Sequence, residues 1–124
     1  MEEGYRKMKP LTESQIQKMC VEWFRRRYPS LGGAFHSVPN GGARNAWTGK
    51  ILKDEGAVSG VADLELLVPR HGYGSLSIEM KKPGGKQSKE QKEYEKLMKS
   101  LNNKYVVCYS LEDFREKVME YLER

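Results

Sequence analysis

The chain has 124 residues, of which 31% are charged, and its formal net charge is +5. This length favours one domain over residues 1–124, with room for a single hydrophobic core. No apolar run reaches the roughly 18 residues that span a bilayer, and the N-terminus lacks the apolar stretch of a signal peptide, so we expect a cytoplasmic protein with no membrane partner. The positive charge favours a polyanionic partner, although it is weak evidence on its own.

The two cysteines, Cys20 and Cys108, lie far apart in the chain and outside any CxxC spacing. Only His36 and His71 could join them as metal ligands, so neither a disulfide framework nor a zinc site is indicated. We expect both thiols to be reduced and to pack in the core.

The first predicted element is a helix that begins after Thr12. Thr12 and Gln15 form a capping-box pattern, and apolar residues then recur at helical spacing as far as Tyr28, where the following proline disfavours continuation. The glycines, prolines and asparagines that come next predict three short elements in order: a strand over 34–38, a loop over 39–45 and a helix over 46–55.

Two strands over 61–69 and 74–82, joined by the glycine-containing loop RHGY, are predicted next. Ser88 and Gln91 then form a second capping box for a helix over 88–101. Within this helix, apolar residues at helical spacing predict a buried stripe made of Tyr94, Leu97, Met98 and Leu101.

The run KYVVCY over 104–109 is typical of a strand buried on both faces, and Ser110 is expected to cap a last helix. The element order is therefore αβββαβ with an additional C-terminal helix. This order predicts an α/β fold in which a mixed four-stranded sheet lies between helices.

Charged residues on the predicted hairpin point to a site. Alternation along its second strand places Glu79 and Lys81 on one face. Antiparallel partners have residue numbers with a constant sum, so a turn centred near His71 sets Asp63 opposite one of these two residues. Two carboxylates and an amine are therefore expected to converge at one end of the hairpin.

Two carboxylates that lie close together repel each other unless a cation neutralises them, and oxygen ligands suit Mg²⁺ or Mn²⁺. We expect a metal held by Asp63, Glu79 and the backbone carbonyl of Met80, with Lys81 orienting water, stabilising a phosphoryl transition state or acting as a base. The alternative is structural: Glu79 and Lys81 could form a solvated surface pair, and Asp63 could end a turn.

The strings GVADL, IEMKKPGGK and SKEQK resemble the VRR-NUC family of virus-type replication and repair nucleases, in the PD-(D/E)xK superfamily. The likeness runs from about Thr12 to Leu122 and implies the PD-(D/E)xK nuclease-like core. In this resemblance Asp63 is the acidic metal ligand, and Glu79 and Lys81 are the ExK pair. The chain has alanine where the family has a proline before the aspartate, which removes no ligand.

The resemblance also implies two auxiliary residues. Gln91 corresponds to a cleft residue that contacts phosphate or water, although it can also close the capping box with Ser88, and both roles are compatible. Gln17 stands where many members carry a glutamate in the first helix, and its alternative is a plain surface position. A loop like residues 39–42 also occurs in the family.

The implied activity is hydrolysis of DNA phosphodiester bonds by a Mg²⁺- or Mn²⁺-dependent endonuclease. By resemblance the substrate is branched DNA such as a Holliday junction, the context is DNA repair or a virus or phage, and the protein is a homodimer. The rivals are a non-catalytic nucleic-acid-binding module on the same fold, and an exonuclease or restriction-type nuclease. The residues expected to contact nucleic acid are Asn40, Gly41, Gly42, Arg44, Lys82, Lys86 and Lys89.

Overall fold

The computed structural model describes residues 9–39 and 46–124, and for residues 46–48 it describes the backbone only. Its helices and strands follow the predicted order along the chain. They are α1 (Glu13–Arg27), the 3₁₀ helix η2 (Pro29–Ala34), β1 (Phe35–Ser37), α2 (Ala46–Asp54), β2 (Leu64–Leu66), β3 (Leu76–Met80), α3 (Lys89–Ser100), β4 (Lys104–Cys108) and α4 (Leu111–Glu123).

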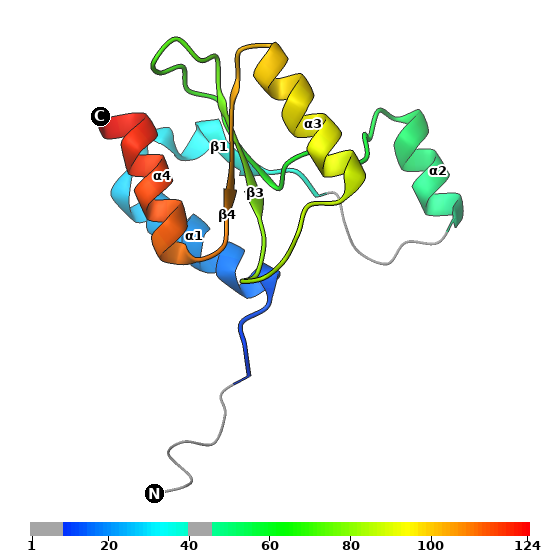
Figure 1. Cartoon of the computed structure of the whole chain (residues 1–124), viewed down its shortest axis with the longest axis horizontal. Coiled ribbons are helices and arrows are strands. Elements are labelled where there is room, and N and C mark those ends of the chain that lie inside the picture. Colours follow the sequence, from blue (N-terminus) through cyan, green and yellow to red (C-terminus); the bar gives the residue numbers. More distant parts are fainter. Residues whose placement is uncertain (1–8, 40–45) are drawn as a thin grey trace, which may run out of the picture.

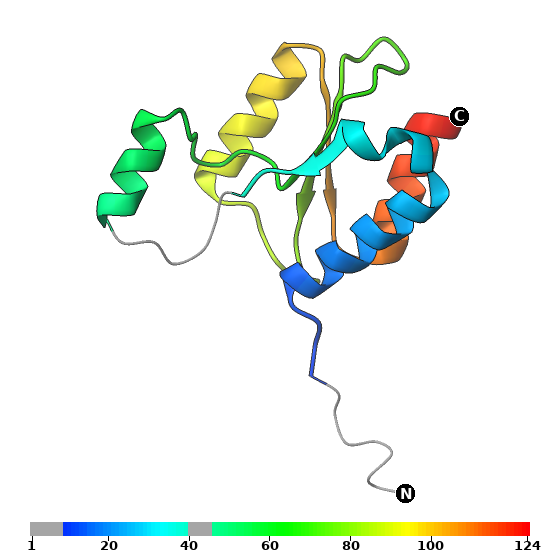
Figure 2. The same ribbon diagram turned by 180° about the vertical axis from the view of Figure 1, so that it is seen from behind.

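The strands form one mixed sheet in the order β1-β2-β3-β4. The first three strands are antiparallel neighbours, and β4 lies parallel to β3 after the crossover through α3. Figure 1 shows α1 and α4 on one side of the sheet and α3 on the other. Both the front view and the view from behind in Figure 2 show α2 standing apart from the sheet. The predicted mixed four-stranded α/β fold is confirmed.

The capping boxes fix where two helices begin. Thr12 caps α1 by accepting a hydrogen bond from the Gln15 backbone N–H at 3.1 Å, while its own N–H donates to the Gln15 side chain at 2.8 Å. Ser88 and Gln91 make the same pair of bonds at the start of α3. Each box satisfies backbone donors that have no partner within the helix, which is why the sequence located both starts.

The hairpin strands are shorter than predicted. Strand β2 begins only at Leu64, although the pattern predicted a strand from residue 61. Gly60 has φ +82, a left-handed conformation that interrupts extended backbone just before this point. Asp63 directly precedes β2, and its carboxylate rather than a backbone carbonyl accepts the Met80 N–H. A side-chain hydrogen bond therefore replaces the backbone pairing between the two strands at this residue.

The hydrophobic core lies between the sheet and the pair α1 and α4. Leu64, Leu66, Leu76, Ile78 and Met80 all project from the same face of the sheet and are at most 1% exposed. They pack against buried side chains of the two helices, namely Ile16, Cys20, Phe24, Phe114, Val118 and Tyr121. Cys20 and Cys108 are both free and buried, in agreement with the expected reduced packing residues.

The predicted burial of the α3 stripe was wrong. Leu97 is 51% exposed and Leu101 59% exposed, while Tyr94 and Met98 are only partly buried. Helix α3 covers the polar face of the sheet, and it contacts that face through polar groups rather than through leucines. Strand β4 forms the edge of the sheet, so Val106 and Val107 are also only half-buried.

Within residues 9–39 and 46–124, no helix has the length and apolar character needed to cross a membrane.

Phe24 offers a test of the core. It is fully buried, and its ring stacks on that of Phe35 with centroids 4.0 Å apart. We expect Phe24→Ala to lower the free energy of unfolding by about 3–5 kcal/mol, because the substitution removes apolar contact and leaves a cavity. Urea denaturation measures the loss. Met19→Ala, on the exposed side of the same helix, should cost less than about 1 kcal/mol, and equal losses in both variants would contradict this core.

Candidate active site

Asp63 and Glu79 meet through the register of the hairpin. Leu64 pairs with Ile78, so Asp63, which precedes β2, stands next to the position of Glu79 in the same register. From the sequence alone, either Glu79 or Lys81 could stand opposite Asp63, and the observed register places Glu79 there. Asp63 Oδ2 accepts a hydrogen bond from the Met80 N–H at 2.7 Å, which ties the start of β2 to the end of β3.

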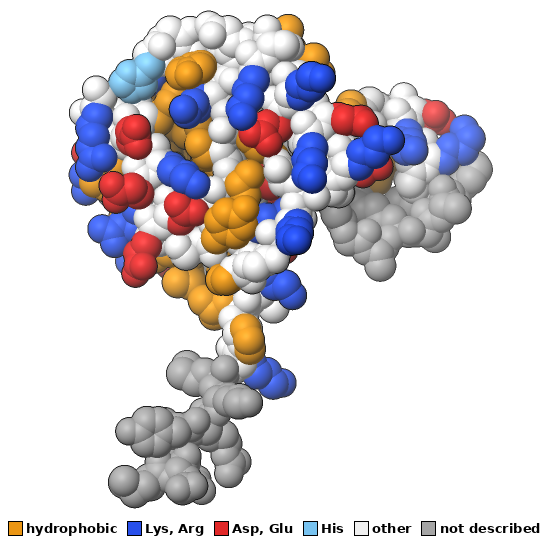
Figure 3. Space-filling model, in the orientation of Figure 1, with side chains coloured by type: hydrophobic (Ala, Val, Ile, Leu, Met, Phe, Trp, Pro, Cys, Tyr) orange, Lys and Arg blue, Asp and Glu red, His pale blue; other side chains and the backbone are white. Residues whose placement is uncertain are grey.

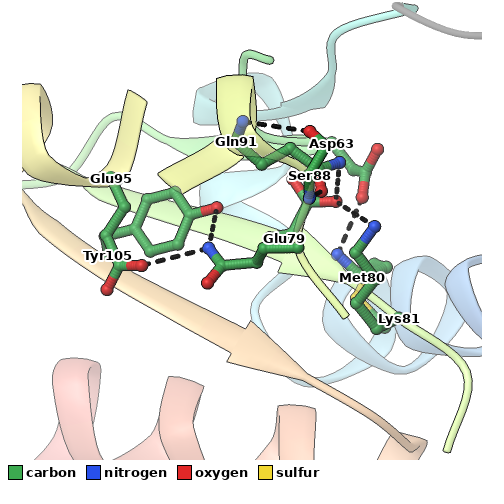
Figure 4. A network of polar contacts seen from close by, with 9 residues as sticks. Asp63, Glu79, Met80, Lys81, Ser88, Gln91, Glu95 and Tyr105 are labelled. Carbon is green, nitrogen blue, oxygen red and sulfur yellow. Dashed lines mark hydrogen bonds and ion pairs between the residues drawn. The ribbon is translucent and has the colours of Figure 1, made fainter. Parts of the chain in front are cut away.

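The Glu79 carboxyl group is buried between the sheet and α3. Only 1% of Glu79 is exposed; its Oε2 accepts a hydrogen bond from Gln91 Nε2 at 2.9 Å and lies 3.7 Å from Lys81 Nζ. Figure 4 shows these groups gathered at the end of the strand. Burial, followed by the charge of Asp63, raises the pKa of Glu79 to about 8, and the opposing effect of Lys81 is smaller. At neutral pH the folded protein therefore favours the protonated form of Glu79 when no cation is bound.

Gln91 closes the capping box and also points toward the acidic pair, while its contact with phosphate or water stays a prediction. Its Oε1 accepts the Ser88 backbone N–H at 2.8 Å, which closes the capping box, and its Nε2 donates to Glu79. The capping bond holds the amide group in one orientation and leaves its N–H₂ directed at the carboxylate. One side chain therefore links the beginning of α3 to the acidic pair.

The PGG segment forms the turn that connects β3 to α3. The Gly85 N–H donates to the Lys82 carbonyl at 2.9 Å, and Gly84 has φ +85. A proline at the second position and a left-handed glycine at the third are typical of a type II turn. The Gly85 backbone packs against Lys81, since a Cβ added to this glycine would lie 3.4 Å from the Lys81 Cβ. The turn thus fixes the lysine beside Glu79.

A second polar network on the same face was missed in the sequence. Glu65 Oε1 accepts from the Ser77 hydroxyl at 2.7 Å and Oε2 accepts from the Tyr94 hydroxyl at 3.0 Å. Burial raises the pKa of Glu65 and is also the main cause that raises the pKa of Tyr94 to about 12. Alternation placed Glu65 on the face of Asp63, and Tyr94 follows Gln91 by one helical turn, so the signal for this network was present.

Gly60 lets α3 approach the loop that leads into Asp63. A Cβ at this glycine would lie 2.5 Å from the backbone carbon and oxygen of Glu90, in the first turn of α3. With φ +82, the position also suits glycine better than any residue with a side chain. The close packing of these two backbones holds Gln91, the next residue in the helix, over the acidic pair.

Glu13 of the first helix also bears on the site, and the role inferred for Gln17 stays a prediction. Gln17 lies on the wall of a groove formed by α1 and β1, and no hydrogen bond joins it to Asp63 or Glu79 among the described residues. Glu13, one turn earlier, is close enough for its charge to raise the pKa of Glu79. The sequence gave Glu13 no role, although it shares the helical face of Gln17 at i, i+4 spacing.

The predicted nucleic-acid contacts are only partly described. Lys82, Lys86 and Lys89 are exposed on the turn and at the start of α3, close along the chain to Lys81. The other four candidates, Asn40, Gly41, Gly42 and Arg44, lie outside the described residues.

The comparison with solved structures agrees with this architecture. A structure described as a VRR_NUC domain protein superimposes with a TM-score of 0.82 at 23% sequence identity, covering 94% of this chain and 92% of that chain. The chain has the fold of a VRR-NUC domain. No protein-family model and no curated protein matches it.

The oxygen groups at this end of the VRR-NUC fold suit a hard divalent cation. Glu79 Oε1 is buried and accepts no hydrogen bond from a donor among the described residues, and the Glu79 carboxyl group lies close enough to Asp63 for the two to share a proton. The Met80 carbonyl points to the same side of β3 as the Met80 N–H, which bonds Asp63. No three His, Cys, Asp or Glu side chains gather into a metal site in the described ranges. Mg²⁺ commonly binds one or two carboxylates and keeps water as its other ligands, so the acidic pair and this carbonyl fit.

Gly60→Ala should weaken both the fold and the site. The added Cβ collides with the Glu90 backbone and the residue must keep a positive φ, so we expect a loss of about 2–4 kcal/mol in unfolding free energy. Gly56→Ala is the matched control, because Gly56 also has a positive φ of 109 but nothing lies within 4 Å of its Cβ position. Urea denaturation compares the two, and equal losses would show that the contact with α3 is unimportant.

The pH dependence of thermal stability tests the buried Glu79. Its pKa is raised from 4.5 to about 8, so the folded protein holds this proton more tightly than the unfolded chain. The resulting stabilisation is complete below pH 4.5 and is lost as the pH rises through 8. We expect the Tm of the wild type in EDTA to fall as the pH rises from 4.5 through 8, and the Tm of Glu79→Gln to fall much less. For a domain of this size, a change of about 1 kcal/mol in stability corresponds to roughly 4 °C in Tm.

Metal binding adds a second readout to the same experiment. Millimolar Mn²⁺ or Mg²⁺ should raise Tm of the wild type at the alkaline end of the range, where Glu79 ionises more readily, and should leave Glu79→Gln unchanged. Glu116→Gln, an exposed position on α4, controls for the loss of a carboxylate elsewhere. A wild-type Tm that does not respond to either cation would contradict the metal site.

Proposed function

We propose that the protein is a divalent-metal-dependent nuclease that hydrolyses phosphodiester bonds in DNA. The observation that carries the proposal is the cluster of Asp63, buried Glu79 and Lys81, in which one Glu79 oxygen accepts no hydrogen bond from a donor among the described residues. The VRR-NUC fold supports it, and the three residues are those that the sequence likeness matches to the acidic ligand and the ExK pair.

Asp63, Glu79 and the Met80 carbonyl would hold Mg²⁺ or Mn²⁺. When bound there, the cation supplies a Lewis acid that acidifies a water molecule and offsets charge on the phosphate. Asp63 is oriented by the Met80 N–H at 2.7 Å, and Glu79 by Gln91 at 2.9 Å. These bonds restrict both carboxylates to one arrangement, which lowers the cost of organising the site when the substrate arrives.

Lys81 is the amine of the reaction. Its side chain is only 12% exposed, and its Nζ lies 3.7 Å from Glu79 Oε2, so the ammonium group is held beside the carboxylate and is largely shielded from solvent. From there its ammonium group would orient the attacking water or stabilise the charge that develops on the phosphoryl oxygens.

The surface around the site favours a polyanionic substrate. Figure 3 shows Lys and Arg side chains gathered over α3, with acidic side chains between them. Lys82 and Lys86 precede this helix, and Lys89, Lys92 and Lys96 are exposed along it. Such a surface contributes sequence-independent binding to a DNA backbone and makes that binding sensitive to salt.

We further propose that the preferred substrate is branched or junction DNA and that a homodimer is the active form, as the sequence resemblance implies. A two-fold dimer would match a substrate with two-fold symmetry. Sedimentation of the protein alone and with a four-way junction measures the stoichiometry. Equal cutting of linear duplex and junction by a monomer would overturn both parts of this proposal and leave the nuclease itself standing.

Asp63→Asn is the sharpest test of catalysis. The asparagine oxygen can still accept the Met80 N–H, so the fold should survive while the charge that holds the cation is lost. We expect cleavage to fall by about 10²-fold or more, since the metal and its charge stabilisation are central to the reaction. Asp54→Asn, at an exposed position on α2, is the control and should cut normally.

The assay also separates the proposal from its rivals. Closed circular, linear and four-way-junction DNA are incubated with Mg²⁺, Mn²⁺ or EDTA, and binding is followed in parallel by gel shift. Binding without metal-dependent cutting would identify a non-catalytic module. Degradation that requires a DNA end would identify an exonuclease. Normal cutting by Asp63→Asn would contradict the site.

A further inference from the structure

A second feature beside the acidic cluster is a groove of about 380 Å³ between α1 and the edge strand β1. Figure 2 shows this side of the molecule, with α1 and β1 on the face that is turned away in Figure 1. The stacked rings of Phe24 and Phe35 hold helix and strand together. The walls are formed by four α1 residues in one stripe, Ser14, Lys18, Val21 and Arg25, with His36 and Ser37 of β1 opposite.

The groove is cationic and rich in hydrogen-bond donors. Lys18 and Arg25 are exposed, and neither has a carboxylate partner among the described residues. They stand seven residues apart on one helical face, about 10.5 Å along the axis. Glu22, the acidic residue of the groove, faces its own cation, Arg26, at 3.9 Å. The groove therefore keeps two positive charges available for an anionic ligand.

The groove leads to the candidate active site. Ser37 and Leu64 are paired across β1 and β2, and both line the groove. Leu64 follows Asp63 directly in the chain, with its side chain on the α1 face of the sheet while that of Asp63 lies on the α3 face. The Asp63 carbonyl accepts the Val38 N–H at 2.9 Å. Ser14 and Gln17 form the part of the α1 wall nearest to the start of that helix, which lies beside Lys82 and Pro83 just after β3. A chain molecule cut at the acidic cluster can thus continue along α1.

We propose that this groove binds the phosphodiester backbone of the DNA strand that flanks the scissile bond. The inference rests on the proposed nuclease function. Lys18 and Arg25 contact successive parts of the backbone, while Gln17 and Ser37 supply hydrogen bonds. The groove lies between one helix and one strand, and we assign to it one backbone of the DNA. Gln17 accordingly contacts the strand and not the metal.

Binding measurements on the full chain in EDTA test the groove independently of cleavage. In Lys18→Gln with Arg25→Gln, two phosphate contacts are lost, and we expect Kd for labelled DNA to rise about tenfold or more. The plot of log affinity against log salt should become shallower by about 1.4 for single-stranded DNA or about 1.8 for duplex DNA. Fluorescence anisotropy with both kinds of DNA provides these values, and Tm verifies that each variant is folded.

The matched control removes the same number of positive charges away from the groove, on the side of the opposite edge strand β4. Lys104 and Arg124 line a separate pocket beside His71, so Lys104→Gln with Arg124→Gln changes the net charge equally without touching the groove. A weaker affinity and a shallower salt slope in the groove variant alone, with either DNA, support the proposal. Equal affinities of the two double variants with both DNAs overturn it.

Cleavage by the same variants separates this proposal from the proposed function. If the wild type cuts, the groove variant should raise KM about tenfold while kcat changes less than about twofold, because the lost contacts are equally strong in the ground and transition states. A wild type that binds through Lys18 and Arg25 but never cuts would retain the groove and reject the nuclease. If the wild type cuts and the groove variant binds DNA with normal affinity, the nuclease is retained and the groove is rejected.

Discussion

The burial of the Glu79 carboxyl group is the constraint on which the rest of the site depends. A carboxylate that is 1% exposed loses most of its hydration, and the nearby Asp63 adds repulsion, so its pKa rises to about 8. The protein compensates only in part, through the amide of Gln91 and the ammonium of Lys81. A buried acidic pair of this kind is stable when protonated or when a cation neutralises it, and this is the physical basis of the proposed metal site.

Helix α3 creates this environment, although its apolar residues do not bury themselves against the sheet. It is held by contacts spread over its first two turns: Gln91 on Glu79, Tyr94 on Glu65, and the backbone of Glu90 against Gly60. Each contact connects α3 to a different part of the hairpin. The helix is therefore positioned by polar groups with defined directions, which suits a site whose oxygen atoms must be held within a few tenths of an ångström.

The local signals in the sequence predicted much of this arrangement. The capping boxes at Thr12 and Ser88 located two helices because a cap depends only on residues within one turn. The alternation of side chains and the turn near His71 predicted that Asp63 would meet the Glu79 face. The interpretation failed for the α3 stripe, since apolar periodicity shows which face is apolar and not what covers it. It also missed the bond between Tyr94 and Glu65 and gave Glu13 no role.

The sequence by itself determined the order of the elements, the helix starts and the convergence of acidic and basic side chains on one hairpin, since these follow from short-range geometry. Only the tertiary structure decided that Glu79 is buried, that Gln91 serves both the cap and the carboxylate, and that Gln17 faces a groove beside β1. These properties depend on how elements distant in the chain pack together. Burial and pKa shifts arise from that packing, so periodicity and spacing contain no information about them.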